Sequence, residues 1–193
     1  MNMPRLMTDR LILRKFSEDD NAAAYEIFSD EEVNRFLPWF PVTSREDAAA
    51  FLKQHYLDAY DAGSSWAYAI CLKENNAPIG DIGIQMDGGY DLGYGLHRDY
   101  WGKGYVTEAG QAVLDLAKSS GLPFVTATHD IHNLKSGKVM QRLGMTYRYS
   151  YKEQWQPKDI LVTFRMYQID FAPEAKTYAK YWEMYPEHFV ETI

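Results

Sequence analysis

The sequence predicts a single domain of the α/β class. Short runs of apolar or alternating residues, typical of strands, interchange along the chain with segments whose apolar residues recur at helical spacing. The 193 residues are enough for one domain with a sizeable core, and no internal repeat, low-complexity segment or linker divides them. The hydrophobic fraction of 46% and the charged fraction of 24% are those of an ordinary globular protein.

In the first half of the chain, a predicted strand over residues 10–16 precedes two predicted helices. Ser17-Glu-Asp-Asp20 supplies capping oxygens and first-turn acids for a helix that runs to about Ser29. Thr43 and Ser44 open a second helix, which carries apolar residues at helical spacing until Gly63 ends it. Three strands follow, separated by a polar turn and a glycine turn, and they cover residues 66–72, 78–86 and 90–97.

The connection between these two helices, residues 30–41, is rich in large apolar residues. It contains Phe36, Leu37, Trp39 and Phe40 together with two prolines. Such a segment is either a wall of a substrate pocket or a plug of the core, and the sequence leaves both interpretations open.

In the second half, a glycine loop leads into a helix that ends near Ser120. A strand over 124–129, a helix over 133–143 and a closing strand pair over 146–152 and 159–171 follow. Beyond them, aromatic residues recur at near-helical spacing, which is typical of a helix that buries one face: Tyr178, Tyr181, Trp182, Tyr185 and Phe189. We therefore expect a main domain over residues 8–171 and a C-terminal aromatic helical extension over 172–193, packed on the same domain rather than used for dimerisation.

The most informative segment is residues 94–109, which combines a strand, a short glycine loop and the first turns of a helix. In that order, the unpaired amides of the helix N-terminus lie at the mouth of a strand, where they can hold a phosphorylated ligand. Gly102 and Gly104 allow a close backbone approach and a positive φ, and Lys103 between them adds a cation. No window fits a Walker loop, and the third glycine of a dinucleotide fingerprint is missing, so neither a nucleotide hydrolase nor a nicotinamide enzyme is favoured.

Four motifs follow one another along the chain: Thr8-Asp-Arg-Leu-Ile-Leu-Arg14, Pro78-Ile-Gly-Asp-Ile-Gly83, Trp101-Gly-Lys-Gly-Tyr-Val-Thr-Glu-Ala109, and Asn133-Leu-Lys-Ser136 with Arg142-Leu-Gly-Met145. In this order they resemble the GNAT superfamily of N-acetyltransferases, and within it the branch that contains the ribosomal-protein N-terminal (alanine/serine) acetyltransferases. The resemblance covers roughly residues 8–170. It implies the GNAT fold, a twisted, mixed and mostly antiparallel sheet flanked by helices, whose splayed central strands form a slot for acetyl-coenzyme A (acetyl-CoA).

The resemblance also implies which residues hold this cosubstrate. Tyr94 and Leu96 would pair through their backbone with the pantetheine arm, and a local widening of the strand would aim one N–H at the thioester oxygen. The amides of the loop would cradle the pyrophosphate, and the loop consists of Trp101, Gly102, Lys103, Gly104, Tyr105 and Val106. Val106 stands where Gly or Ala is usual, and Trp101 replaces an Arg or Gln that often opens the loop.

After the fifth family strand, Asn133 is implied to bond a pantetheine amide, and Ser136 to lie near the sulfur. An N-cap and a first-turn polar residue would also explain these two side chains, and the two interpretations are compatible. Many GNAT enzymes carry a tyrosine as general acid farther along this helix, but residues 138–142 contain none. Ser136 or solvent is then the remaining proton donor for the leaving thiolate.

The sequence does not single out a general base. His129 and His132 end the predicted fifth strand and could reach the amine directly or through water, although local hydrogen bonding in a loop explains them equally well. A metal site built from this pair and Asp130 lacks matching ligands at recognised spacing, so we expect no metal. Three further residues are candidates for the base: Asp91, Glu108 and His97.

The net charge of −7 and a pI near 5.2 argue against general nucleic-acid binding. An acidic protein that binds an anionic ligand must concentrate positive charge locally, and four cations lie beside the two anion-binding motifs: Arg98, Lys103, Lys135 and Lys138. The remaining acidic surface would suit an amine or a basic peptide. A single cysteine, Cys71, in an apolar run reads as a small buried hydrophobe, and it excludes an internal disulfide.

These observations lead to one expected function and two alternatives. We expect a cytoplasmic acetyl-CoA-dependent N-acetyltransferase, a monomer or homodimer without a membrane partner, because no apolar run approaches a membrane span. The branch it resembles implies transfer to the N-terminal amine of a protein or peptide. A small amine such as a polyamine, an aminoglycoside or an amino-acid-like metabolite is an alternative acceptor, and a non-catalytic CoA-binding module is an alternative class.

Overall fold

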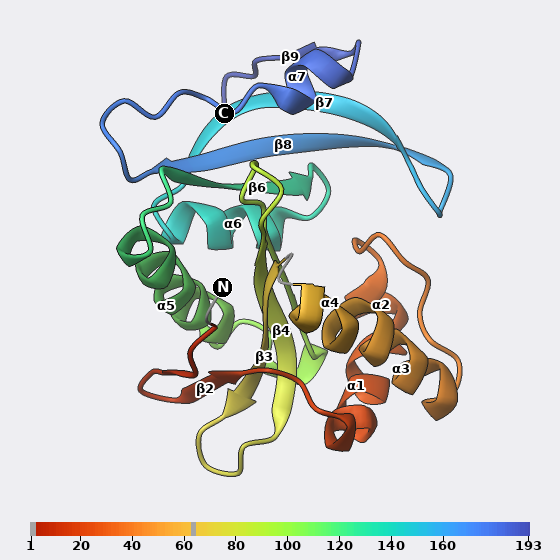
Figure 1. Cartoon of the computed structure of the whole chain (residues 1–193). Helices are drawn as coiled ribbons and strands as arrows, with labels where there is room; N and C mark the ends of the chain where they lie inside the picture. Colours follow the sequence, from red (N-terminus) through yellow and green to blue (C-terminus); the bar gives the residue numbers. More distant parts are fainter. Residues whose placement is uncertain (1–2, 63–64) are drawn as a thin grey trace.

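The computed structural model describes residues 3–62 and 65–193 and arranges them as two sheets with helices around them (Figure 1). The strands are β1 (Leu6–Met7), β2 (Leu11–Arg14), β3 (Ser65–Leu72), β4 (Pro78–Gln85), β5 (Leu92–Leu96), β6 (Phe124–Asp130), β7 (Thr146–Trp155), β8 (Ile160–Asp170) and β9 (His188–Phe189). The helices are α1 (Asn21–Phe28), α2 (Glu31–Asn34), α3 (Arg45–Leu52), α4 (Asp58–Ala62), α5 (Tyr105–Ser119), α6 (Leu134–Arg142) and α7 (Lys180–Met184), with shorter turns η1 (Glu18–Asp20), η2 (Lys53–Leu57) and η3 (Arg98–Tyr100).

The strands form two antiparallel sheets, in the orders β1-β2-β3-β4-β5 and β6-β8-β7-β9. Among the described residues, β5 and β6 are joined by one parallel bridge, between Asp91 and Thr126. Beyond this bridge the two strands diverge, because each continues in its own sheet. The predicted splaying of two central strands is therefore confirmed, and it goes far enough to divide the predicted single sheet into two.

Helices cover both faces of the first sheet, which explains why its second strand is not half-buried. On one face, α5 and α6 pack against a core that includes Leu11 and Leu13, and on the other α1 and α3 pack against Ile12. These three consecutive residues of β2 are each at most 6% exposed. The strand predicted over residues 10–16 thus forms a continuous buried run at its centre instead of alternating between a buried and an exposed face. Within the described part of the chain, no helix is long and apolar enough to cross a membrane.

The first predicted helix begins as a 3₁₀ turn, η1, and continues as α1. Its start is fixed by a reciprocal capping box, in which the backbone N–H of Ser17 donates to Asp20 over 2.8 Å. Arg14 donates two further bonds to the same buried carboxylate, over 2.7 and 2.8 Å. Burial raises the pKa of Asp20, but the bonds from Arg14 and Ser17 outweigh it, so the pKa is lowered and the carboxylate stays charged.

The second predicted helix runs as α3, η2 and α4 in succession. Ser44 caps it as expected, since its hydroxyl accepts a hydrogen bond of 3.0 Å from the backbone N–H of Asp47. Its middle section, η2, is a π-helical turn, a feature that often accompanies functional sites. His55 and Tyr56 of this turn line the cavity described below. Gly63, the predicted end of the helix, lies outside the described residues.

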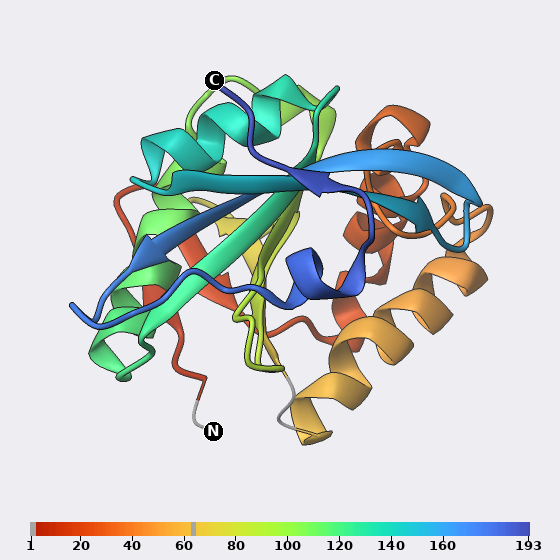
Figure 2. The same cartoon turned by 90° about the horizontal axis from the view of Figure 1, so that it is seen from above.

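The C-terminal segment is less helical than its aromatic spacing predicts. Only α7 is helical, and it stops at Met184 because Tyr185 precedes Pro186, which disfavours helical backbone at that position. Strand β9 then pairs with β7, and the segment lies against the second sheet (Figure 2). Tyr181 and Tyr185 both stack on Tyr151 of β7, with ring centroids 5.0 and 4.8 Å away. A division of the chain at residue 171 stays a prediction.

We expect Cys71 of the native protein to resist alkylation. The thiol is fully buried in the core beneath α1, and burial raises its pKa to about 11, so little reactive thiolate forms at pH 8. Iodoacetamide at pH 8 should leave the folded protein unmodified by mass spectrometry, whereas the same reagent in urea should add one group per chain. Stoichiometric alkylation of the folded protein would contradict this burial.

Candidate active site

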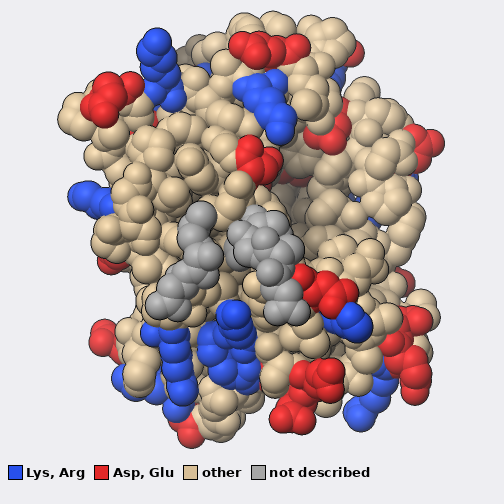
Figure 3. Space-filling model, viewed as in Figure 1, with Lys and Arg blue, Asp and Glu red and all other residues tan. Residues whose placement is uncertain are grey.

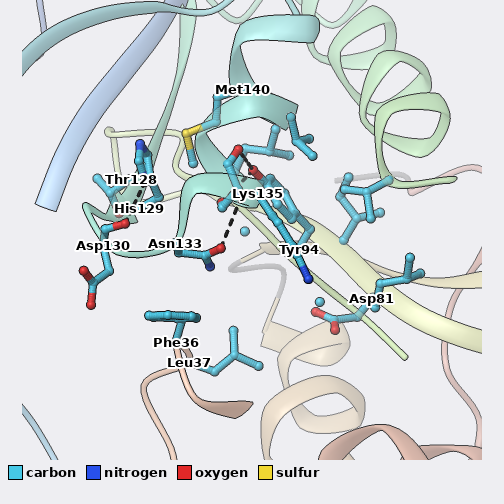
Figure 4. A pocket seen from close by; sticks show the side chains of 18 of the residues that line it. Phe36, Leu37, Asp81, Tyr94, Thr128, His129, Asp130, Asn133, Lys135 and Met140 are labelled. Atoms are coloured by element: carbon cyan, nitrogen blue, oxygen red, sulfur yellow. Dashed lines mark hydrogen bonds between the residues drawn. The ribbon is translucent and has the colours of Figure 1, made fainter. Parts of the chain in front are cut away.

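A cavity of about 1220 Å³ opens where β5 and β6 diverge (Figure 4). It is bounded by β4 and β5, by the glycine loop and the first turns of α5 and α6, by the connection that contains Phe36, and by β7, β8 and the C-terminal segment. Both sheets therefore contribute to a single space. Of the residues predicted to bind the cosubstrate, all except Lys103 line this cavity, as do His129, His132 and Asp91 among the candidate bases.

The glycine loop has the backbone conformation that its glycines allow. Gly102 and Gly104 have φ values of +74° and +81°, in the left-handed region that favours glycine. Gly104 is the N-cap of α5, and no side chain caps this 15-residue helix. The first amides of α5 are therefore free to meet an anion at the cavity edge.

Arg10 holds the loop from outside, a role that the sequence did not reveal. Its guanidinium donates to the carbonyl oxygen of Lys103 over 3.0 Å and to Glu108 over 2.7 Å, and it lies over the ring of Tyr105 at 4.3 Å. Glu108 also accepts from the Thr8 hydroxyl over 2.5 Å. This carboxylate, a candidate base in the sequence, is thus used to join the N-terminal segment to α5.

Arg98 and Lys135, two of the cations expected at the anion site, contact other side chains of the protein. Arg98 pairs with Asp30, so it fastens η3 to the start of α2 instead of facing the loop. Lys135 lies over the indole of Trp101, 4.2 Å from the ring centroid, and therefore remains beside the loop. Lys138 lines the cavity from α6.

Tyr94 of β5 and Asn133 at the start of α6 lie in the same pocket (Figure 4), and Ser136 contacts both of them. Asn133 is the N-cap of α6, and its side-chain oxygen accepts from the backbone N–H of Ser136 over 3.3 Å. The Tyr94 hydroxyl donates to the Ser136 carbonyl over 3.0 Å and lies 2.9 Å from the Ser136 hydroxyl. Burial raises the pKa of Tyr94, so it remains a neutral hydroxyl. The structure thus brings a tyrosine from β5 to the helix in which the sequence showed none.

Leu96 and the strand around it differ in detail from the expectation. The Leu96 carbonyl accepts a hydrogen bond of 2.7 Å from the indole N–H of Trp101, which ties the strand end to the loop. Pairing between β4 and β5 keeps one register from Gly80–Leu96 to Ile84–Leu92. The local widening expected in this strand is therefore absent from the described pairing.

His129 lines the cavity, but its free ring nitrogen does not face open space. Nδ1 lies 2.8 Å from the carbonyl oxygen of Asp130, and because a carbonyl only accepts, Nδ1 carries the proton. Nε2 is buried and has no partner within the described part of the chain, and a Cβ built on Gly137 would lie only 2.8 Å from it. Burial lowers the pKa of His129, which keeps it neutral. His132 is exposed, and the described residues hold no cluster of metal-ligating side chains.

Two other candidate bases, His97 and Asp91, also have hydrogen-bond partners. His97 caps η3 through a 3.3 Å bond from the backbone N–H of Asp99. Asp91 lines the cavity and accepts from the Thr126 hydroxyl over 3.3 Å, and burial raises its pKa to about 7.

Aromatic residues enclose the half of the cavity that faces away from the glycine loop. The 36–39 connection lines it, and Trp39 also packs on Phe51 at 5.1 Å, so this segment is both a pocket wall and part of the core. The opposite wall comes from β7, β8 and the C-terminal segment, with Tyr151, Glu153, Trp155, Phe164, Tyr181 and Tyr185. In the sequence, the spacing of the C-terminal tyrosines was the one indication of this wall.

Asp81 of β4 was missed altogether. It lines the cavity, and burial raises its pKa to about 7, although the adjacent Tyr56 hydroxyl opposes the rise. A signal was present, since Asp81 is the one charged residue in the otherwise apolar run 78–84. In the sequence, Asp81 belongs to the motif Pro78-Ile-Gly-Asp-Ile-Gly83, and the family resemblance assigns it no role.

Together these features suit transfer of an acyl group from an anionic carrier to an amine. Free amides and cations lie at one end of the cavity, hydroxyl groups that can donate protons lie in its middle, and aromatic and acidic side chains lie at the other end.

Comparisons with known proteins agree with this chemistry. The chain matches the family model of the GNAT acetyltransferase domain over residues 10–146. It is 32% identical over 144 residues to an uncharacterised N-acetyltransferase, YnaD, of Bacillus subtilis, which covers 72% of this chain and 81% of that protein. The crystal structure of a GNAT-family acetyltransferase from Bacillus anthracis superposes with a TM-score of 0.75 and 25% identity, covering 87% of this chain and 99% of that one.

A further similar structure contains the carrier itself. It is RimL, a ribosomal L7/L12 alpha-N-protein acetyltransferase in complex with coenzyme A, with a TM-score of 0.74, 20% identity and coverage of 87% of this chain and 97% of that one. At this identity the likeness shows the fold alone. The family match over most of the chain and the B. subtilis relative show more: this chain belongs to the GNAT family and is an N-acetyltransferase of that type, an acyltransferase whose family uses acetyl-CoA.

Proposed function

We propose that the protein transfers acetyl directly from acetyl-CoA to a primary amine, and that this amine is the N-terminus of a protein or peptide. The observation that carries the proposal is the division of one cavity into two chemically different halves. Amides and cations border one half, whereas carboxyl groups and aromatic rings border the other. A cavity of this kind can hold an anionic acyl donor and a cationic acceptor at the same time.

In the donor half, we assign the pyrophosphate to the amides of residues 101–106, with Lys135 and Lys103 nearby. The pantetheine arm would follow β5 beside Tyr94 and reach the Asn133 side chain. Ser136 would then lie at the sulfur, held in place by the Tyr94 hydroxyl. The pair can donate a proton to the departing thiolate, which makes a covalent acyl-enzyme unnecessary.

In the acceptor half, Asp91, Glu153 and the tyrosines of the second sheet form surroundings that favour an ammonium group. The outer surface follows the same trend. Acidic side chains gather over the helices α1–α4, while Lys and Arg gather below the N-terminal segment (Figure 3). An acidic approach to the acceptor half would steer cationic substrates toward it. RimL, named as an alpha-N-protein acetyltransferase, supports a protein N-terminus as the acceptor.

One contact favours a small amine as the alternative acceptor. The tip of the β7–β8 hairpin carries Lys158, whose ammonium donates to the carbonyl oxygens of Asn34 and Arg35 over 2.7 and 3.1 Å. This contact joins the two walls of the acceptor half. A chamber closed at this point accommodates a compact amine more readily than an extended chain.

The function is tested by titrating acetyl-CoA in a calorimeter and by following thiol release with a panel of acceptors. The panel contains peptides that begin with serine or alanine, polyamines and aminoglycosides. We expect micromolar binding of acetyl-CoA and turnover that depends on a free N-terminal amine, so an N-formylated copy of the best peptide should be inactive.

Activity on polyamines or aminoglycosides alone would overturn the peptide assignment. Tight binding of acetyl-CoA without turnover on any amine would favour a non-catalytic CoA-binding module.

A further inference from the structure

The side of β4 and β5 that faces the acceptor walls is almost bare of side chains. In the register of these strands Gly83 lies opposite Gly93, and Asp81 lies opposite Gly95. Since directly opposed residues project to the same face, these four positions share one surface. A Cβ built on Gly93 would meet none of the described residues within 4 Å, whereas one built on Gly83 would lie 2.3 Å from the carbonyl oxygen of Trp66, so the surface is open at Gly93.

Asp81 is the one functional group among these four positions, and its carboxyl lies over the backbone of β5. A Cβ built on Gly95 would be only 2.7 Å from Oδ1 of Asp81. Gly95 stands between Tyr94 and Leu96, the two residues assigned to the pantetheine arm. Only a glycine at this position leaves room for the carboxyl to lie there.

Oδ1 of Asp81 is buried and has no hydrogen-bond partner among the described residues, although the Tyr56 hydroxyl lies close enough to the carboxyl group to lower its pKa. A buried carboxyl oxygen without a donor is costly, so in a working site it is expected to receive one from a ligand. The side chain of Leu37, in the connection that lines the acceptor half, would lie 3.9 Å from the Cβ built on Gly95. Oδ1 of Asp81 therefore lies where β5 and this connection come together.

We infer that Asp81 is the catalytic base of this enzyme and accepts the proton of the acceptor ammonium. The inference rests on the proposed function. In the step, the carboxylate takes one proton from the ammonium, and the free amine forms the N–C bond at the thioester carbon. The C–S bond then breaks, the nitrogen loses its second proton, and the thiolate gains one. One proton is therefore released overall.

The surroundings of Asp81 fit a base that works near neutral pH. Burial raises its pKa to about 7, close to the optimum for a general base at that pH. The titratable groups that face it are Tyr56 of η2 and Tyr60 of α4, and burial raises the pKa of both phenols, so they stay neutral.

The test compares Asp81→Asn with the wild type on a serine-initiated tetrapeptide, across pH 5.5 to 9. We expect kcat/KM of the wild type to fall as the pH drops below about 7, and Asp81→Asn to lower it about 100-fold and move the midpoint of this acid limb to the pKa of the peptide amine, about 8. Asp91→Asn is the matched comparison, because that carboxyl is equally buried with the same pKa but has Thr126 as a partner. In Asp91→Asn the midpoint of the acid limb should stay at about 7, whatever the rate of this variant.

A second acceptor separates a lost base from a damaged fold. Trifluoroethylamine is already neutral at pH 7, so the loss caused by Asp81→Asn should shrink to less than about tenfold with this amine. Acetyl-CoA binding and the melting temperature of the variant should match the wild type. If Asp81→Asn turns over the peptide at the wild-type rate, or keeps the midpoint of the acid limb at about 7, Asp81 is not the base. A wild type that binds acetyl-CoA but acetylates no amine would instead overturn the proposed function.

Discussion

Replacing Gly104 with valine should weaken the binding of acetyl-CoA about 30-fold or more. Gly104 has a φ of +81°, where a side chain costs about 1–2 kcal/mol and a β-branched one more. The loop would relieve this strain by rotating, which turns the first amides of α5 away from the pyrophosphate. A loss of about 2 kcal/mol of binding energy corresponds to a 30-fold change in Kd, measurable by calorimetric titration.

Gly121→Val is the matched control for this variant. Gly121 follows α5 at its opposite end, with a φ of +82° and nothing within 4 Å of an added Cβ. It should suffer comparable backbone strain while leaving the affinity for acetyl-CoA unchanged. Lys103→Ala should cost only about 1 kcal/mol, because amides supply most of the contact and this lysine does not line the cavity. Wild-type affinity in Gly104→Val would show that the loop does not hold the pyrophosphate.

The sequence predicted those parts of the site whose conformation depends only on residues close by in the chain. The positive φ of Gly102 and Gly104 and the caps formed by Ser44 and Asn133 are local properties, since each depends on neighbours within one turn. A glycine before the start of a helix and a polar residue at an N-cap can therefore be predicted from the neighbouring residues alone. The resemblance to a family then ordered these local signals into one site.

The parts that the sequence missed depend on residues far apart in the chain. Asp81 became a site residue because the β4–β5 register sets it opposite Gly95, and Arg10 because it reaches Lys103 across the fold. Strand register follows from the packing of the whole sheet, and a single sequence does not reveal it. The aromatic spacing of the C-terminal segment is visible in the sequence. The packing of these aromatic side chains on β7, and the end of α7 shortly before Pro186, are not.

The Tyr94–Ser136 contact also joins residues far apart in the chain, so the sequence did not predict it. It leads to the second prediction with a large effect, a loss of kcat. From the sequence, the helix after β6 lacked the tyrosine that many relatives carry, and Ser136 or water was left as the proton donor. In the structure, a tyrosine from β5 places its hydroxyl 2.9 Å from that of Ser136. The missing hydroxyl is thus present, supplied by another element, and it can orient the serine toward the sulfur.

Ser136→Ala should lower kcat roughly 10–100-fold and leave KM for acetyl-CoA nearly unchanged, because a bond to the departing thiolate exists mainly in the transition state. Tyr94→Phe should lower kcat as well, and the double variant should be no slower than Ser136→Ala alone if the tyrosine acts through the serine. Asn133→Ala should mainly raise KM and cost ~1 kcal/mol of stability through the lost cap. Single-turnover rates would establish that chemistry is being measured. Unchanged chemistry in a folded Ser136→Ala enzyme would leave water as the proton donor and reduce the Tyr94–Ser136 pair to a structural contact between β5 and α6.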